Sequence, residues 1–168
     1  MDNVVTRRQA LGTLAGVAAA AAPAEVPEID ARVVARNDAA LERAMRAQVT
    51  EPGNPRLGGV ADDYAMSHAG AAGGLVEMAA ASFVAAGSKY RGSAEVLDRI
   101  RLAAKFLERA QSPEGNIDLL STNFNSPPDT GFVVHNVGTA AAIAKALGAF
   151  EWQRLSAGQG TKGPRLHD

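Results

Sequence analysis

Hydrophobic residues recur at helical spacing in the segment Ser93–Gln111, which is the clearest helix that the sequence predicts. Ser93 is a good N-cap residue, and Glu95 in the first turn complements the helix dipole. Glu95 and Arg99 are spaced to form an ion pair on the solvent side. The apolar stripe consists of Val96, Leu97, Ile100, Ala103, Ala104 and Leu107.

Three further segments show helical patterning, and together they predict an all-α protein of antiparallel helical hairpins. They are Ile29–Val49, Asp62–Gly87 and Pro128–Leu147. The stretch EPGNPRLGG at 51–59 separates the first two, because its prolines and glycines cannot continue a helix. The small residues at 70–74 predict either close approach of another backbone or a local break. No strand-rich segment is evident.

The composition limits both the core and the chemistry. The chain has 46% hydrophobic residues, but many are alanine and only 5% are aromatic, so few large side chains can fill a core. It has no cysteine, which excludes disulfides, cysteine-bound zinc, a thiol nucleophile and a lipoprotein anchor. Its net charge is −1, and no basic run follows the N-terminal region, so we expect no nucleic-acid partner.

The N-terminal sequence TRRQALGTLAGVAAAAAPAE resembles a twin-arginine (Tat) export signal. An arginine pair precedes a leucine and an apolar run, and small residues then stand where a signal peptidase reads. The residues of this pattern are Arg7, Arg8, Leu11, Ala22 and Ala24. The alternative is a chance arginine pair before an alanine-rich helix.

A signal over residues 1–24 predicts that the Tat translocase is a transient partner and that the mature protein is periplasmic or secreted. The apolar run covers about 13 residues, whereas a membrane span needs roughly 20. We therefore expect no stable membrane anchor after cleavage.

The remaining simple motifs predict neither a cofactor nor a metal site. The tail over 151–168 has no apolar period and is expected to be disordered. Its Gly158–Gly163 stretch fits GxGxxG, but neither a strand nor a helix frames it, so it is read as a chance match. The histidines His68, His135 and His167 have no metal-ligand spacing.

The segment STNFNSPPDTGF, Ser121–Phe132, has the richest chemistry. Part of it predicts a helix start. Ser126 is its N-cap residue, Pro127 occupies the first helical position, and the Asp129 side chain bonds back toward the N-cap as in a capping box.

The helix start leaves Asn123, Phe124 and Asn125 unexplained. Asparagine side chains commonly form hydrogen bonds to the backbone within turns, which is one explanation of these residues. An amide-rich loop with an aromatic ring is also typical of a carbohydrate site, because amides bond hydroxyls and rings stack on sugar faces.

The sequence from Gly115 to Lys145 resembles the helical N-terminal domain of bacterial heparinase II/III-like polysaccharide lyases and their relatives. The similar region covers Val34–Phe150, and Asn116–Phe132 is its most specific part. The resemblance implies an (α/α) toroid with a sugar-binding cleft at one end. It also implies β-elimination on uronic-acid polysaccharides, with a proton-abstracting tyrosine or histidine and an amide or cation on the carboxylate.

On this resemblance, residues 25–150 form a partial toroid whose binding edge contains Asn123, Asn125, Asp129 and His135. His135 is either a proton-transfer group or a surface histidine of the helix. The chain has no counterpart of the family's later His-Arg and Tyr segments, so full lyase activity is not expected of it alone.

A full ring of about twelve helices takes roughly 300 residues, and this chain supplies about four helices. We therefore expect a truncated product that is marginally stable or self-associates, because its apolar faces lack neighbours.

Two other functions remain open at this stage. One is a non-catalytic periplasmic helical module for binding or scaffolding. The other, a Tat-exported redox protein, has little support because the sequence carries no cofactor motif.

Overall fold

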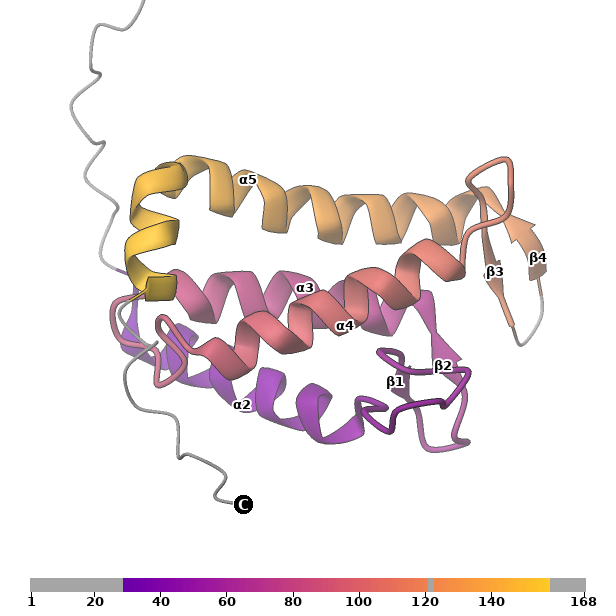
Figure 1. Cartoon of the computed structure of the whole chain (residues 1–168), viewed down its shortest axis with the longest axis horizontal. Coiled ribbons are helices and arrows are strands. Elements are labelled where there is room, and N and C mark those ends of the chain that lie inside the picture. Colours follow the sequence, from indigo (N-terminus) through magenta and orange to yellow (C-terminus); the bar gives the residue numbers. More distant parts are fainter. Residues whose placement is uncertain (1–28, 121–122, 158–168) are drawn as a thin grey trace, which may run out of the picture.

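The centre of the structure, a computed structural model, is a helix that packs against three others (Figure 1). The structure describes residues 29–120 and 123–157; for residue 123 and residues 147–157 it describes the backbone alone. The central helix is α3, and the helices around it are α2, α4 and α5. Their bounds are Ala69–Val84 for α3, Ala31–Ala47 for α2, Ala94–Arg109 for α4 and Pro127–Ala157 for α5. The protein is mostly helical, as predicted.

Helices α2 and α4 are amphipathic and begin at caps. The Asp30 carboxylate accepts a hydrogen bond from the Arg32 amide at 2.8 Å at the start of α2. Ser93 caps α4 as predicted, accepting from the Val96 amide at 3.4 Å. The Glu95–Arg99 ion pair is also present, at 3.3 Å.

The buried face of α4 follows its predicted stripe in part: Phe106 is buried although it was not predicted, and Ile100 is only half-buried. On α2 the buried residues are Val34, Asp38, Leu41 and Met45. On α4 they are Val96, Leu97, Ala103, Phe106 and Leu107. Ala104 was expected in this stripe but is exposed, because it lies on the side of α4 that borders an open groove.

Helix α3 is buried on several sides, and its small residues let α5 come close. A Cβ on Gly73 would lie 3.5 Å from the Asn136 side chain of α5. The Asn136 amide is placed to donate to Glu77 Oε2 at 3.1 Å and to accept from the Gly74 amide at 3.3 Å. Of the two alternatives for residues 70–74, close approach is therefore confirmed, and α3 is not broken there.

Two small antiparallel sheets correct the purely α-helical prediction. Strand β1 (Val60–Ala61) pairs with β2 (Ser67–His68), and β3 (Ile117–Leu119) pairs with β4 (Asn123–Ser126). The first pair occupies part of the segment that was predicted as helix from Asp62 onward. The reason is local, because the Asp62 carboxylate accepts from the Tyr64 and Met66 amides, both at 2.9 Å, and so stabilises a turn.

These elements make two successive units of one design. In each unit a helix ends, a glycine-containing turn follows, two strands pair, and the next helix begins directly after the second strand. Gln48 and Gln111 lie just beyond the first helix of each unit, and each bridges the first strand of its hairpin, at Val60 and Ile117 respectively. Both hairpins lie at the same end of the bundle (Figure 1).

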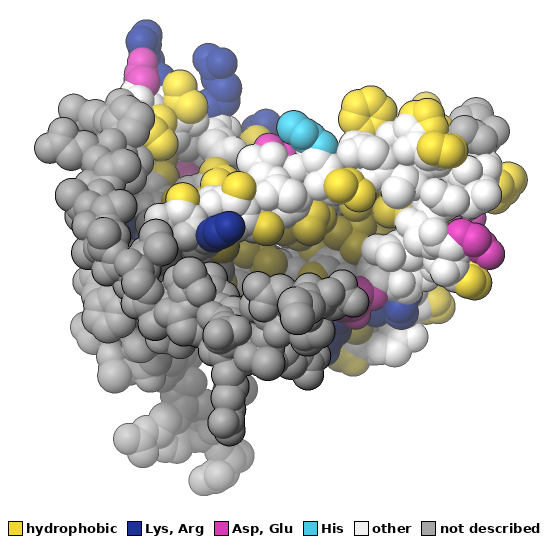
Figure 2. Space-filling model, turned by 90° about the horizontal axis from the view of Figure 1, so that it is seen from above, with side chains coloured by type: hydrophobic (Ala, Val, Ile, Leu, Met, Phe, Trp, Pro, Cys, Tyr) yellow, Lys and Arg dark blue, Asp and Glu magenta, His cyan; other side chains and the backbone are white. Residues whose placement is uncertain are grey.

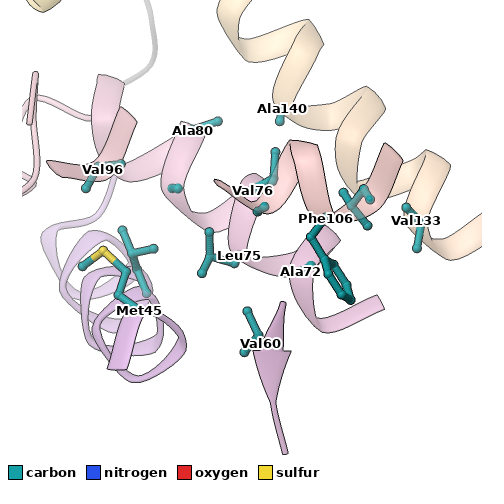
Figure 3. Close-up of a cluster of buried hydrophobic side chains, with 14 of the residues drawn as sticks. Met45, Val60, Ala72, Leu75, Val76, Ala80, Val96, Phe106, Val133 and Ala140 are labelled. Atoms are coloured by element: carbon teal, nitrogen blue, oxygen red, sulfur yellow. The ribbon is translucent and has the colours of Figure 1, made fainter. Parts of the chain in front are cut away.

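The core lies between the helices and the inner faces of the hairpins. Leu41, Leu75, Phe83 and Val96 are fully buried. Figure 3 shows Val60 entering this cluster from β1, with Val133 and Ala140 entering it from α5. The hairpins are thus attached to the core and not only to the helix ends.

An apolar groove of about 470 Å³ runs between α4 and α5 over α3. Val76 of α3 contributes to it, as do Leu107 of α4 and Val133 of α5; Val134 and Val137 are exposed there by 64% and 38%. Figure 2 shows hydrophobic side chains along this side of the molecule. The apolar residues of α5 that line the groove are therefore only partly covered.

We expect this groove to cause the self-association that the sequence predicted. The mass measured by light scattering should rise with protein concentration, because exposed apolar patches of this kind associate. The double substitution Val134→Asp and Val137→Asp should abolish the rise. Phe132→Asp, an exposed residue that does not line the groove, is the control and should leave it. A concentration-independent wild-type mass would contradict the expectation.

Several predicted features lie outside the described residues. The export signal, with Arg7 and Arg8, is one, and residues 158–168 of the predicted tail are another. Residues 151–157, which were assigned to that tail, belong instead to α5. Among the described helices, none is both long and apolar enough to cross a membrane.

Candidate functional site: the second hairpin

One residue before its end, the second hairpin has a residue with left-handed backbone geometry. Asn125 has φ +55°, a conformation that asparagine tolerates better than most residues. Its amide donates to Asp118 Oδ1 at 2.6 Å, which joins β4 to β3. The Asn125 side chain is exposed. One of the two unexplained asparagines therefore has a backbone role that leaves its amide group open to solvent.

Helix α5 begins with the cap that the sequence predicted, formed by Ser126 and Asp129. Ser126 is fully buried; its hydroxyl donates to the Asp129 carboxylate and accepts from the Asp129 amide at 3.4 Å. The Thr130 hydroxyl donates to the Ser126 carbonyl at 2.8 Å and accepts from the Ile117 amide at 2.9 Å. The half-buried Asp129 is therefore engaged in holding the helix start, which limits its part in binding a ligand.

Exposed apolar side chains surround this helix start. Phe124 is 72% exposed and precedes Asn125 in β4, while Phe132 is 66% exposed in the second turn of α5. Leu120, just after β3, is 50% exposed. Asn123 pairs with Leu119 through its backbone, and its side chain is not described. A ring and an amide next to one another in the chain are thus both accessible.

His135 is not gathered with the other predicted site residues. It is exposed on α5, and its carbonyl accepts from the Thr139 hydroxyl at 3.0 Å. It follows Asp129 by six residues, which places it about 9 Å further along the helix and about a third of a turn away. His135 thus lies on the surface of α5, and its role in proton transfer stays a prediction.

The segment around the second hairpin carries acidic residues but no basic residues. Between Ala110 and Ala144 the chain has no lysine or arginine, but it has Glu114, Asp118 and Asp129. β-Elimination requires a group that neutralises the substrate carboxylate. The second hairpin has no lysine or arginine for this step, although the exposed Asn125 amide is present.

The first hairpin holds an acid–histidine pair that the sequence did not indicate. Asp62 Oδ2 lies 3.2 Å from His68 Nε2, and His68 Nδ1 is buried without a hydrogen-bond partner. Ala65, in the turn between them, has φ +58°. The spacing of six residues matches no familiar motif, so only the folded hairpin brings the two side chains together.

The pKa of Asp62 lies below its ordinary value of 3.8. The Met66 amide is the largest cause, and the Tyr64 amide and His68 also lower the pKa, outweighing the desolvation that raises it. A carboxyl with a lowered folded-state pKa stabilises the fold above its ordinary value, and that contribution is lost as the pH falls through the folded value.

We therefore expect the first hairpin to loosen as the pH falls below about 3.8. NMR exchange of the Tyr64 and Met66 amides, corrected for intrinsic exchange, should show falling protection in that range. In the matched variant Asp62→Asn, which cannot ionise, protection should not change with pH there. The same acid loss in both proteins would contradict the expectation.

The described residues contain no group of three or more side chains suited to bind a metal ion. Comparisons with protein-family models, with curated proteins and with solved structures found no match.

Proposed function

We propose that this protein is exported and binds a polysaccharide at its second hairpin, as part of a toroidal polysaccharide-active protein. The observation that carries the proposal is that Phe124 and Asn125, consecutive in β4 and directly before a well-bonded helix start, are both exposed. A ring can stack on a sugar face while an amide donates to and accepts from hydroxyls. Asn123 precedes them in the same strand.

The repeated units support the toroidal part of the proposal. A toroid of helical hairpins has its inner helices parallel, with all hairpin loops of one kind at one end. Here α3 and α5 both begin at a hairpin, lie side by side, and have their hairpins at the same end.

We do not propose that this chain is a lyase by itself. His135 is remote from Asp129 along α5, and residues 110–144 contain no lysine or arginine. The expected activity is binding, with any cleavage requiring groups beyond those at this hairpin.

Calorimetric titration of the full chain with oligosaccharides of defined length tests the binding. Phe124→Ala should weaken binding about fivefold or more, since loss of a stacking ring costs on the order of 1–3 kcal/mol. Asn125→Gly should also weaken it, because glycine keeps the left-handed backbone but removes the amide. Val33→Ala, at an exposed apolar position near the start of α2, is the control. Binding that neither hairpin variant weakens would refute the site.

Export has its own test. Changing Arg7→Lys and Arg8→Lys together keeps the charge but removes the arginine pair. In a bacterium with an active Tat system, we expect the wild type in the periplasm or medium and the variant in the cytoplasm. Export of both proteins alike would contradict a Tat route.

One observation favours the alternative of a non-catalytic binding or scaffold module. The α4–α5 groove is apolar and open, which suits another helix better than a sugar. The two functions separate experimentally: a scaffold module should lose its partner in the variant with Val134→Asp and Val137→Asp but keep it in Phe124→Ala.

A further inference from the structure

The two hairpins are equivalent parts of the repeated unit. Val60 and Ile117 each begin the first strand, and both are buried, with exposed fractions of 7% and 3%. Each pairs with the residue that directly precedes the following helix, His68 in one unit and Ser126 in the other. What one hairpin presents to solvent can therefore be compared directly with what the other presents.

The first hairpin also presents an aromatic ring to solvent. Tyr64 lies in the turn between β1 and β2 and is 83% exposed, more than any other large hydrophobic side chain of the described residues. Its amide donates to Asp62 Oδ1 at 2.9 Å, so the turn that bears the ring is held in place. Core packing does not explain why an aromatic residue occupies this position, because a side chain this exposed buries little area.

The hairpins are close enough to serve one extended ligand. Both contact the central helix α3, and they precede α3 and α5, which pack against one another. Packed helices lie about 8–10 Å apart, so the starts of α3 and α5, which the two hairpins directly precede, are separated by a similar distance. An oligosaccharide of several sugars can span that distance, whereas a disaccharide cannot occupy both hairpins.

We infer that the first hairpin is a second subsite for the polysaccharide bound at the second hairpin, with the Tyr64 ring stacking on a sugar face. The inference rests on the proposed function. Each unit of the repeat then contributes one aromatic subsite at the same end of the bundle. The phenol hydroxyl and the nearby Asp62–His68 pair supply polar groups for sugar hydroxyls.

The effect of two subsites is an affinity that rises with ligand length. Binding at the second site becomes intramolecular once the ligand reaches it, so a longer chain gains affinity without any new kind of contact. Loss of the Tyr64 ring should remove this gain and leave the binding of short ligands unchanged.

The test is calorimetric titration of the full chain with a disaccharide and with a hexasaccharide of the same sugar. The wild type should bind the hexasaccharide on the order of tenfold or more tightly than the disaccharide. Tyr64→Ala should reduce only the hexasaccharide affinity, to near the disaccharide value. Tyr64→Phe, which keeps the ring, should behave like the wild type.

The other outcomes distinguish a failure of the second subsite from a failure of the proposed function. If Phe124→Ala weakens binding but Tyr64→Ala leaves the hexasaccharide affinity unchanged, the second subsite is refuted and the proposed function stands. An equal loss for both ligand lengths in Tyr64→Ala also refutes a separate subsite. If the wild type binds neither ligand, the proposed function fails, and the second subsite fails with it.

Discussion

Gly58→Ala should destabilise the protein by more than about 3 kcal/mol. Gly58 is buried with φ +91°, and a Cβ there would lie 2.0 Å from the backbone carbonyl oxygen of Leu102 in α4. A backbone carbonyl cannot rotate away as a flexible side chain can. The loop before β1 would have to move off α4, which would also disturb the bonds from the Gly58 amide to the Val49 carbonyl and from the Gln48 side chain to the Gly58 carbonyl.

Gly53→Ala is the matched control for this prediction. Gly53 has a similar φ of +83°, but no atom beyond its own residue and its two chain neighbours lies within 4 Å of the position its Cβ would take. Alanine there should cost only the strain of a left-handed backbone, about 1 kcal/mol. The free energy of unfolding in urea measures both variants, and equal losses would show that the contact between the loop and α4 is not as described.

Asp38→Ala should destabilise the protein by about 3 kcal/mol, because it leaves several buried donors without an acceptor. Asp38 is 6% exposed, on the inner face of α2. Its Oδ1 accepts from the Ser82 and Ser88 hydroxyls at 2.6 and 2.7 Å, and its Oδ2 accepts from the Lys89 amide at 3.0 Å. One carboxylate thus joins α2 to the end of α3 and to the loop before α4.

Two further variants sharpen the Asp38 prediction. Asp38→Asn keeps one oxygen for the hydroxyls but turns an amide donor toward the Lys89 N–H, so we expect an intermediate loss. Asp98→Ala removes a carboxylate whose side chain is 68% exposed and should change the unfolding free energy by less than about 0.5 kcal/mol. If Asp38→Ala behaves like Asp98→Ala, the buried network does not stabilise the fold.

The helices could be predicted because their signals are local. Ser93, Glu95 and the apolar stripe of α4 lie within a few turns, as do Ser126 and Asp129 at the start of α5. Asp38 shows the limit of such signals, because its helical spacing places it on the face of Val34 and Leu41, but the three partners that satisfy its carboxylate lie 44 to 51 residues away in sequence.

The hairpins escaped prediction because their strands are two to four residues long, too short for alternation to be recognised. Their pairing is supported by hydrogen bonds that the Asp62 carboxylate accepts within the first hairpin's turn and that the Asp118 carboxylate accepts across the second hairpin. Of the candidate site, the sequence indicated Phe124 and Asn125, but it could not indicate Tyr64. That ring becomes a candidate only when the repeat places both hairpins at one end.

The most direct test of glycan binding at the second hairpin is an NMR titration of the full chain with a hexasaccharide, following backbone amide shifts. Glycan binding at this hairpin should produce saturable shifts at Asn123–Ser126 and in the first turn of α5. Weaker shifts should occur around Tyr64 and none along the α4–α5 groove. Shifts confined to the groove residues, or no saturable shift at either hairpin, would contradict glycan binding at the second hairpin.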